Sequence, residues 1–361
     1  MELIHADSKK LKKRLVKFYM DQYRKDPLRR DSMSGLLKGL LYKKSVMTAS
    51  AFLEPVLVMD GGRIIMTAVL AQAERMPEAL QICFLESDGY DPEAFSVILK
   101  RAEELGRQRG AKQITGSLNL HVNYGLGFLS NSYDKVQSFG MSHNPEYFHR
   151  YFTENVFRPI DLVSFKKDMR GVDQLMGESI RGRIESRYRV RELDLKKLPE
   201  EAELYTRINN QAFSSHPFYY RRVPEEDLEL FNDFKLFLKS ENLLFVYRED
   251  VPVGFMLWYP DFHQLMKPGE TIGLKTLLRF WMDKSNIDTF KIVEMGVIEK
   301  EKGRGAILAL FQYCLEKTRG RYSFMESGWV LEDNADSRAF GLKWADGESR
   351  RYTAYIKELR G

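Results

Sequence analysis

The sequence predicts an α/β (α+β) protein with two domains in tandem, each a mixed, mostly antiparallel twisted sheet flanked by helices. A chain of 361 residues is long enough for two domains that each bury a core. In both halves, short strand-like runs stand between runs whose apolar residues repeat at helical spacing. Hydrophobic residues make up 43% and charged residues 30% of the chain, which is typical of a folded protein.

Charge and cysteine content narrow the function classes. The formal net charge of +5 is small for this length, and basic and acidic residues are interspersed, so charge gives no case for a nucleic-acid partner. Cys83 and Cys314 lie in apolar runs and are expected in the core, so we expect neither a disulfide framework nor a bound metal. The N-terminus lacks a signal peptide's apolar core, and no apolar run reaches 18 residues. The sequence therefore predicts a cytoplasmic protein without a membrane partner.

The first half is expected to contain a helix, a hairpin and a strand followed by a second helix. Ser8 can cap a helix over residues 8–23, and two β runs on either side of residues 60–62 are typical of a hairpin. A strand over 81–85 leads into a helix over 91–106. The loop over 86–91 is acidic and would repel a phosphate, so we expect no phosphate-bearing ligand to bind at this loop.

The middle of the chain sets the predicted domain limits. Residues 169–190 are charged and poor in large apolar side chains, which indicates a connector between domains at 1–168 and 191–361. The arginines near it are expected to face solvent, or alternatively to form a basic lip for phosphates: Arg181, Arg183, Arg187, Arg189 and Arg191. Three histidines have no cysteine or carboxylate at ligand spacing, so we expect packing or hydrogen bonding from His121, His143 and His149.

The second half begins with two helices and two strands. Helices are predicted over 198–212 and 224–239, and strands over 243–247 and 253–258 form a hairpin. After the central strand and helix described next, the chain is expected to end in a strand over 322–329, a short helix opened by Glu332-Asp333-Asn334, and a closing strand over 350–357.

The most informative stretch joins a strand to a helix through a glycine-rich loop. Residues 290–297 are strand formers, and Ile307 to Leu315 carry an apolar stripe at helical spacing. Gly303-Arg304-Gly305 lets the backbone turn tightly and leaves the first helix amides unpaired. The helix dipole and the side chains of Lys300, Lys302 and Arg304 favour a phosphate there. The loop therefore predicts an anion site, although glycines that only turn the chain are the alternative.

These residues also carry a resemblance. Lys300 to Gly305 resembles the (Gln/Arg)-x-x-Gly-x-(Gly/Ala) loop with which GNAT-type acyltransferases hold the pyrophosphate of acetyl-CoA, here with Lys in the first place. The Gly-x-x-Asn segment at Gly116, the His-Asn-Pro-x-Tyr-Phe segment at His143 and the Arg-Tyr-x-x-Tyr ending at Arg351 are similar to a bacterial family of tandem GNAT-like proteins of about this length.

The resemblance implies two GNAT-like domains, the first degenerate and the second binding an acyl-CoA. It implies an N-acyltransferase, in the first instance an N-acetyltransferase, that uses acetyl-CoA or a longer acyl-CoA and a small-molecule or peptide amine. The residues implied in binding acyl-CoA are Met295, Val297, Lys300, Lys302, Gly303, Arg304, Gly305, Ala306 and Asn334. Many members carry a tyrosine acid about seven residues after that Asn, but here Gly341 holds the place and Phe340 has no hydroxyl.

Glu294 is the candidate general base. It lies mid-strand on the face opposite Val293, Met295 and Val297, and a carboxylate in an apolar cleft would have a raised pKa. An exposed or paired strand glutamate is the plainer interpretation. Two other functions remain possible from the sequence: a CoA-binding or sensing protein without catalysis, and a peptidyl-type transferase that uses aminoacyl-tRNA. The sequence is also compatible with a homodimer.

Overall fold

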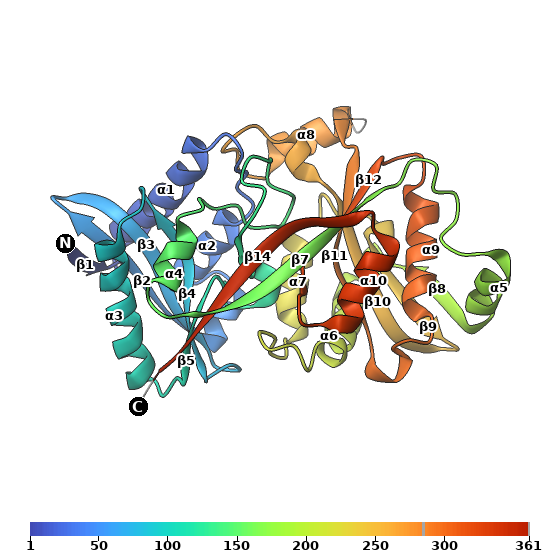
Figure 1. Ribbon diagram of the computed structural model, residues 1–361, viewed down its shortest axis with the longest axis horizontal. Coiled ribbons are helices and arrows are strands. Elements are labelled where there is room, and N and C mark those ends of the chain that lie inside the picture. The colour runs from blue at the N-terminus through green and yellow to red at the C-terminus, as the bar shows by residue number, and fades with distance from the viewer. Residues whose placement is uncertain (284–285, 360–361) are drawn as a thin grey trace.

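The computed structural model describes residues 1–283 and 286–359 (Figure 1). In this part of the chain the strands form one 14-stranded sheet in the order β1-β2-β3-β4-β5-β14-β7-β12-β11-β10-β9-β8, with β6 beside β14 and β13 beside β7. The strands are β1 (Glu2–His5), β2 (Ala51–Asp60), β3 (Arg63–Ala73), β4 (Ala79–Ser87), β5 (Gln113–Gly116), β6 (Phe128–Leu129), β7 (Arg158–Asp168), β8 (Tyr188–Glu192), β9 (Leu243–Arg248), β10 (Val251–Pro260), β11 (Thr289–Val297), β12 (Phe324–Ser327), β13 (Val330–Leu331) and β14 (Gly347–Glu358).

Helices cover both faces of the sheet (Figure 1). The α-helices are α1 (Lys9–Lys25), α2 (Ser34–Leu41), α3 (Pro92–Gln108), α4 (Phe148–Thr153), α5 (Glu178–Arg187), α6 (Leu198–Ala212), α7 (Pro224–Asp233), α8 (Leu274–Met282), α9 (Ala306–Thr318) and α10 (Ala335–Trp344). Short 3-10 turns join them: η1 (Val46–Ser50), η2 (Val122–Tyr124), η3 (Leu195–Lys197), η4 (Ser240–Asn242), η5 (Phe262–Leu265) and η7 (Glu299–Glu301). The predicted α/β class, with a mixed and mostly antiparallel sheet, is confirmed.

Two strand pairs are parallel, and both separate after four residues. β4 pairs with β5 from Ala79 to Ile82, and β11 pairs with β12 from Thr289 to Ile292. Beyond these points β4 runs on to Ser87 and β11 to Val297 without their parallel partner. Each separation leaves the longer strand without its parallel partner, and at the β4–β5 separation the space between the strands forms a pocket.

Two strands pair with strands from the opposite half of the sequence, which joins the two predicted sheets into one. β14, at the end of the chain, is antiparallel both to β5, with Tyr355 opposite Gly116, and to β7. β7 in turn is antiparallel to β12, with Met325 opposite Lys167. The strand pairing therefore crosses the predicted connector, and the division at 1–168, 169–190 and 191–361 stays a prediction.

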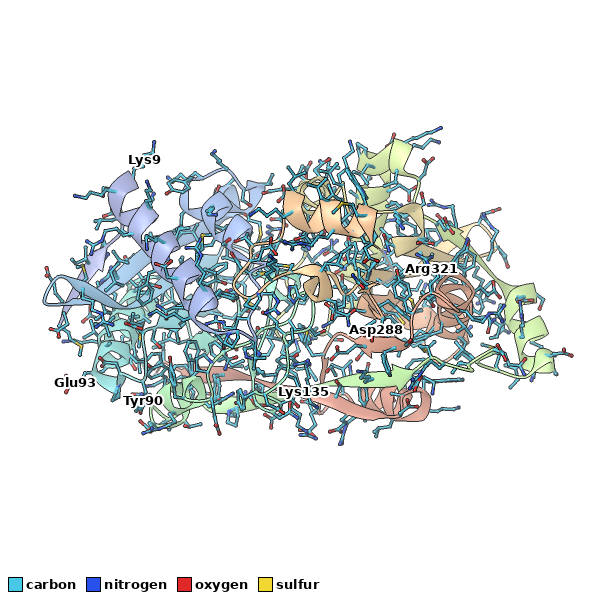
Figure 2. All side chains as sticks on the ribbon, turned by 90° about the horizontal axis from the view of Figure 1, so that it is seen from above. Lys9, Tyr90, Glu93, Lys135, Asp288 and Arg321 are labelled. Carbon is cyan, nitrogen blue, oxygen red and sulfur yellow. The ribbon has the colours of Figure 1, made fainter. Side chains whose placement is uncertain are left out.

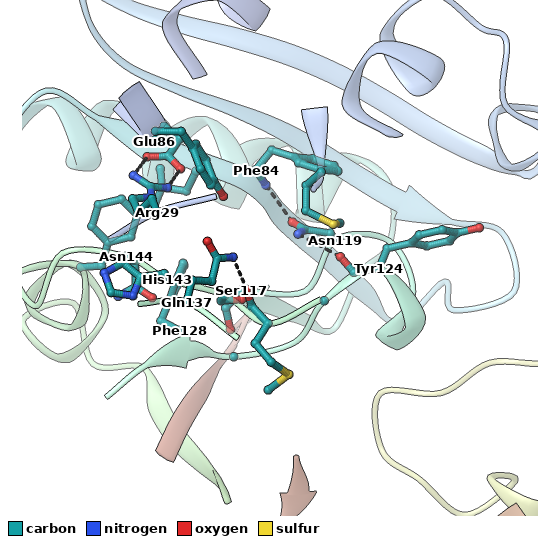
Figure 3. Close-up of a pocket in the computed structure, with 18 of the residues that line it drawn as sticks. Arg29, Phe84, Glu86, Ser117, Asn119, Tyr124, Phe128, Gln137, His143 and Asn144 are labelled. Atoms are coloured by element: carbon teal, nitrogen blue, oxygen red, sulfur yellow. Dashed lines mark hydrogen bonds and ion pairs between the residues drawn. The ribbon is translucent and has the colours of Figure 1, made fainter. Parts of the chain in front are cut away.

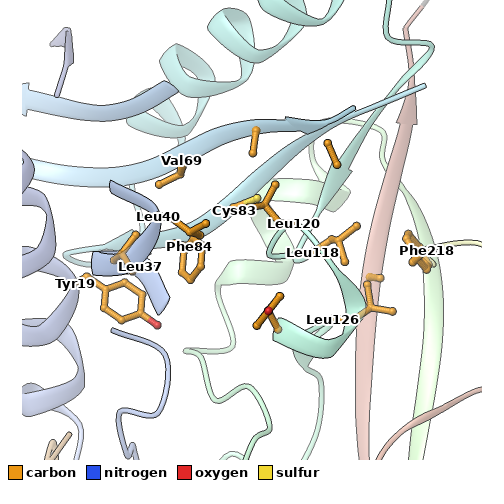
Figure 4. Close-up of a cluster of buried hydrophobic side chains, with 14 of the residues drawn as sticks. Tyr19, Leu37, Leu40, Val69, Cys83, Phe84, Leu118, Leu120, Leu126 and Phe218 are labelled. Carbon is orange, nitrogen blue, oxygen red and sulfur yellow. The ribbon is translucent and has the colours of Figure 1, made fainter. Parts of the chain in front are cut away.

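The hydrophobic core also links the two halves of the sequence. One buried cluster lies under α1 and α2 and contains Tyr19, Leu37 and Cys83 (Figure 4). Phe218, from the loop between α6 and α7, belongs to the same cluster and is 1% exposed. Cys314 is buried in another cluster under α9, so both cysteines are core residues, as predicted.

Several helix limits follow the capping signals in the sequence. Ser8 accepts a hydrogen bond from the Leu11 amide at the start of α1, and Asp91 accepts one from the Ala94 amide at the start of α3. α6 has the predicted bounds, Leu198–Ala212. α7, however, ends at Asp233 and not at 239, because the amides of Phe237 and Leu238 turn back to the Phe234 carbonyl and bring both side chains into the core.

Candidate functional site

β11, the glycine loop and α9 form the predicted strand, loop and helix. Gly303 has φ +70° and Gly305 has φ +106°, a left-handed backbone that other residues adopt at a cost. Gly305 is the N-cap of α9 and has no side chain to bond the first helix amides. In the described part of the chain, the amides of Gly305, Ala306 and Ile307 have no hydrogen-bond partner. They remain free for an anion at the positive end of the helix dipole.

Gly305 is also required by packing against α5. A Cβ at Gly305 would lie 2.2 Å from Cδ1 of Ile184, so a larger residue requires the Ile184 side chain to move. The Tyr188 hydroxyl donates to the Glu301 carboxylate at 2.7 Å and lies 3.3 Å from the Arg304 carbonyl oxygen. The segment predicted as a connector therefore supports the loop from one side.

Charged side chains surround the loop, but several are paired. Nζ of Lys302 lies 2.5 Å from the Glu299 carboxylate, and Nη1 of Arg248 lies 2.7 Å from the carboxylate of buried Glu301. Lys300 and Arg304 are exposed. Nη1 of Arg187, on α5, lies 3.5 Å from the Arg304 carbonyl oxygen, which brings one of the five connector arginines to the loop.

The corresponding loop of the first half lacks these free groups. Asp91 caps α3 with its own carboxylate, and the Asp91 amide donates to the Tyr151 hydroxyl at 2.9 Å. Asp88 forms ion pairs with Lys25 and Arg63. Asp91 therefore caps this helix start, where the Glu93 amide alone in the first turn has no hydrogen-bond partner among the described residues. That this half does not bind CoA in the usual way stays a prediction.

Glu294 lies on β11 just beyond the last residue paired with β12, on the face that α6 covers. Nδ2 of Asn209 donates to Oε1 of Glu294 at 2.9 Å, and the Tyr205 hydroxyl donates to Oε2. Burial raises the pKa of Glu294 to about 7, although both hydrogen bonds lower it. Met295 and Val297 pack on the opposite face, in the cluster with α9. The carboxylate can therefore change protonation state near neutral pH.

A buried polar network lies close to Tyr205 and Asn209, the hydrogen-bond donors of Glu294. The Thr206 hydroxyl donates to the Asp227 carboxylate at 2.6 Å, and Nη1 of Arg222 lies 2.9 Å from Asp227. Nη2 of Arg222 donates to the hydroxyl of Tyr124, a residue of the first half, at 3.2 Å. The sequence analysis did not identify Tyr205 or Asn209 as site residues. The two are four residues apart and so are neighbours on one helix face. The available signal was an Asn on the buried side of the helix.

Of the remaining predicted site residues, Ala306 belongs to the helix of the site and Asn334 lies on another element. Ala306 is buried at the start of α9. Asn334 is exposed and caps α10, with its Oδ1 accepting from the Ser337 amide at 3.1 Å. No hydrogen bond joins Asn334 to the glycine loop within the described residues. The Phe340 ring packs 5.2 Å from Phe311, so α10 offers a hydrophobic contact with α9 where a tyrosine acid was sought.

A pocket lies where β4 separates from β5 (Figure 3). Arg29, Glu86 and His143 lie on one side of it, and Asn119 and Tyr124 on the other. Nη1 of Arg29 lies 3.2 Å from Oε2 of Glu86 in a buried ion pair. Burial lowers the pKa of His143 to about 4. The pocket carries a neutralised charge pair rather than a net charge.

The predicted structural roles of two other histidines are confirmed. Nε2 of His121 lies 3.1 Å from the Tyr220 carbonyl oxygen, so this side chain ties the first half to the loop between α6 and α7. Nδ1 of His149 lies 2.6 Å from the Tyr355 hydroxyl, and its Nε2 lies 2.7 Å from the Leu129 carbonyl oxygen. Both rings join separate segments through hydrogen bonds.

Comparisons with known proteins agree with this architecture. No protein-family model matches the sequence. A curated relative, the bacterial ceramide synthase of Caulobacter vibrioides (strain NA1000 / CB15N), is 23% identical over 279 residues, which cover 74% of this chain and 73% of that protein.

Solved structures are similar over nearly the whole chain. A tandem GNAT protein from the clavulanic acid biosynthesis pathway has a TM-score of 0.54 and 12% identity, covering 100% of this chain and 99% of its own. A probable N-acyltransferase of unknown function from Enterococcus faecalis V583 has a TM-score of 0.57 and 9% identity, covering 99% of this chain and 72% of its own. The chain therefore has the tandem GNAT fold.

Proposed function

We propose that this chain is an N-acyltransferase that moves an acyl group from acyl-CoA to an amine, with the acyl-CoA bound by the second half. The observation that carries the proposal is the position of Glu294. Its carboxylate has a pKa of about 7, and it stands on β11 where that strand leaves β12, on the strand that leads into the glycine loop of α9. A base and an anion site on one strand–loop–helix unit suit a thioester donor and an amine acceptor.

The residues of the loop fit a pyrophosphate. The free amides of Gly305, Ala306 and Ile307 would donate to its oxygens, while Lys300, Lys302 and Arg304 would add positive charge. Unpaired backbone groups of β11 around Met295 and Val297 would align the pantetheine arm. When bound, acyl-CoA supplies an activated carbonyl carbon.

Glu294 would take the proton that the amine loses. The amine nitrogen forms a bond to the thioester carbonyl carbon, the carbon–sulfur bond breaks, and the CoA thiolate leaves with the electron pair. The ionised Glu294 carboxylate accepts the ammonium proton, and the thiolate takes a proton from water, since Phe340 and Gly341 offer no acid. Tyr205 and Asn209 act through Glu294 and are positioning residues.

A long-chain amine is the acceptor class to test beside short amines and peptides. The curated relative is named a ceramide synthase, and ceramide is an N-acylated long-chain amine. Aromatic side chains at the end of α6 and in the loop after it lie near β11, since a Cβ at Gly296 would lie 3.2 Å from Cε2 of Phe213. The Phe213 ring lies 5.9 Å from Tyr219, and His216 lies 6.0 Å from Trp329.

The test compares Gly303→Asp with Gly303→Asn by calorimetric titration of acetyl-CoA and palmitoyl-CoA. No atom lies within 4 Å of a Cβ at Gly303, and both new residues tolerate its left-handed backbone, so the variants differ chiefly in charge. We expect the Asp variant to lose binding at least tenfold relative to the Asn variant, with both folded by circular dichroism. Equal affinity in the two variants would place the CoA phosphates elsewhere.

Turnover distinguishes the remaining functions. Acyl-CoA binding together with amine-dependent release of CoA thiol supports the acyltransferase. Tight binding without release for any amine would favour a CoA-sensing protein. A wild-type protein that binds no acyl-CoA would contradict the proposal, and salt-dependent retention of tRNA would then favour the aminoacyl-tRNA alternative.

A further inference from the structure

α8 exposes an apolar stripe that the described chain leaves uncovered. Thr276, Leu277 and Phe280 face inward and are buried, with the Phe280 ring 5.2 Å from Phe262. The opposite side consists of Leu274, Leu278, Trp281 and Met282, which are 68%, 44%, 57% and 77% exposed. Leu274, Leu278 and Trp281 are spaced i, i+4 and i+7, so they line one side of the helix.

This grouping differs from the other exposed apolar residues of the described chain. Val156, Val251 and Leu342 are also exposed, but they stand singly on separate elements. Single exposed apolar residues are ordinary, whereas several on one short helix mark a surface that contacts something apolar. Burial of the Leu278 and Trp281 side chains would favour binding to a partner with an apolar surface.

Positive charge lies beside the stripe. Lys275, on α8 itself, is exposed. The segment before α8 packs on the end of α1, since a Cβ at Gly269 would lie 2.5 Å from Cα of Arg24 and the Gly269 amide donates to the Arg29 carbonyl at 3.0 Å. The segment before α8 therefore contacts the C-terminal end of α1. Figure 2 shows the molecule from above, with Lys9 labelled at the opposite end of α1.

The exposed side of α1 is strongly basic. Its exposed cations include Lys9, Lys10, Lys13 and Lys17. Lys17 pairs with Asp21 at 2.5 Å, whereas Lys9, Lys10 and Lys13 have no carboxylate within 4.0 Å in the described part of the chain. Unpaired lysines at the surface attract an anionic partner over about a Debye length.

We propose that α8 and the basic side of α1 dock this chain onto the surface of an anionic lipid bilayer. The apolar stripe of α8 enters the headgroup boundary with the helix axis parallel to the membrane plane, and the indole of Trp281 lies at the headgroup level. Lys9, Lys10, Lys13 and Lys275 lie over anionic headgroups. The apolar stripe and the unpaired lysines together are complementary to an anionic lipid surface, because such a surface presents hydrocarbon next to negatively charged headgroups.

The contact is peripheral and reversible. No helix in the described residues has the length and apolar character to cross a bilayer. The apolar side of α8 is only about two turns long, so it gives a shallow insertion. Each lysine near an anionic surface adds about fivefold in partitioning, so binding depends on both the stripe and the charges.

Vesicle sedimentation of the full chain tests the proposal. We compare vesicles of phosphatidylcholine alone with vesicles that also contain roughly 40% of the anionic lipid phosphatidylglycerol. We expect wild type to bind the anionic vesicles and the Leu278→Glu, Trp281→Glu variant to lose binding at least tenfold. Leu342→Glu, which changes an exposed helix residue away from α8, is the matched control and should bind like wild type. Lys9→Glu, Lys10→Glu and Lys13→Glu together should weaken binding and reduce its salt dependence.

The outcomes that would contradict the lipid-binding proposal do not depend on catalytic activity. Failure of wild type to sediment with anionic vesicles would overturn the proposal, as would undiminished binding of the Leu278→Glu, Trp281→Glu variant with its fold intact. If vesicles are not bound and that variant turns a dimer into a monomer in size-exclusion chromatography, the stripe is a self-association surface and the lipid proposal is wrong. Trp281→Phe supplies a second readout, because it should abolish the blue shift of tryptophan fluorescence on vesicle binding.

Discussion

The side-chain amide of Asn209 donates a 2.9 Å hydrogen bond to Oε1 of Glu294. Tyr205, one helical turn earlier on α6, donates to the other carboxylate oxygen. Both donors favour the ionised carboxylate, while burial and the nearby Asp227 favour the protonated form. Burial has the larger effect, so the pKa of Glu294 is raised to about 7 from its ordinary value of 4.5. The protonation state therefore depends on a balance that single substitutions can shift.

Glu294→Gln should lower kcat by about 100-fold or more, because it removes the proton acceptor and keeps the size of the side chain. In wild type, kcat/KM should rise with pH to a plateau above about 7, where the carboxylate is ionised. The Gln variant should lose this rise. Release of CoA thiol, measured with an amine that the wild type acylates, gives both effects. A Gln variant with the wild-type pH profile would exclude Glu294 as the base.

The same substitution should change the pH dependence of stability. The folded state holds the Glu294 proton up to about pH 7, whereas the unfolded chain loses it near 4.5. The folded protein therefore binds more protons between these values, and its stability falls as pH rises through that window. Urea unfolding should show wild type losing stability relative to Glu294→Gln between pH 4.5 and 7. A constant difference across that range would contradict the raised pKa.

Tyr205→Phe should raise the midpoint of the pH–rate profile. The change removes a donor to the ionised carboxylate, so the pKa of Glu294 should increase. A net hydrogen bond of about 1 kcal/mol corresponds to about 0.7 pH unit. Tyr247→Phe is the control, since its hydroxyl bonds to Arg191 and not to Glu294. An unchanged midpoint with reduced stability would give Tyr205 a packing role only.

Gly305→Ala should destabilise the fold more than Gly303→Ala. Both glycines have positive φ, so each substitution costs about 1 kcal/mol in backbone strain. At Gly305 the new methyl also lies 2.2 Å from Cδ1 of Ile184, and moving that half-buried side chain adds a further cost of up to about 1 kcal/mol. Ile184→Ala should recover part of the loss in the double variant. Equal effects of the two glycine substitutions in urea unfolding would show that α5 does not pack against the loop in solution.

Local sequence signals predicted the elements of the site but not their partners. Capping residues and apolar spacing gave the bounds of α6 and the start of α3, because these depend on neighbours within a few residues. Alternation along β11 predicted that Glu294 faces away from Met295 and Val297. The helix that covers that face depends on long-range packing, so neither Tyr205 nor the contact of Ile184 with Gly305 could be read from spacing.

The single joined sheet could not be predicted from local sequence signals, because it also depends on long-range contacts. The segments at 158–168 and 347–358 contain strand-forming residues, but nothing within either segment specifies a partner more than 100 residues away. The arrangement was therefore predicted as two separate sheets. The pairing of β14 with β5 and β7, and of β7 with β12, reveals the crossing.

Asp227→Asn should destabilise the fold strongly. Asp227 and Arg222 are at most 1% exposed in their side chains, and the substitution leaves the buried Arg222 guanidinium with only the more distant Glu226 carboxylate, 3.9 Å away. Loss of one partner of a buried ion pair costs about 3–5 kcal/mol. Glu154→Gln, which breaks the exposed pair with Arg150, should cost less than about 1 kcal/mol and is the control. Similar free energies of unfolding for the two variants would mean that water reaches Arg222.

The crossing of β7 and β14 predicts that neither half folds alone. A fragment 1–168 would lack β14, which pairs with β5, and a fragment 169–361 would lack β7, which pairs with β12. Each would expose unpaired strand edges that favour aggregation. We expect both fragments to be insoluble when expressed singly and to form a soluble, cooperatively unfolding complex when coexpressed. As a control, a full-length chain cleaved at an engineered protease site in residues 170–175 should stay associated. A soluble fragment 1–168 with native-like thermal unfolding would show that its sheet closes without β14 and would contradict this account of the joined sheet.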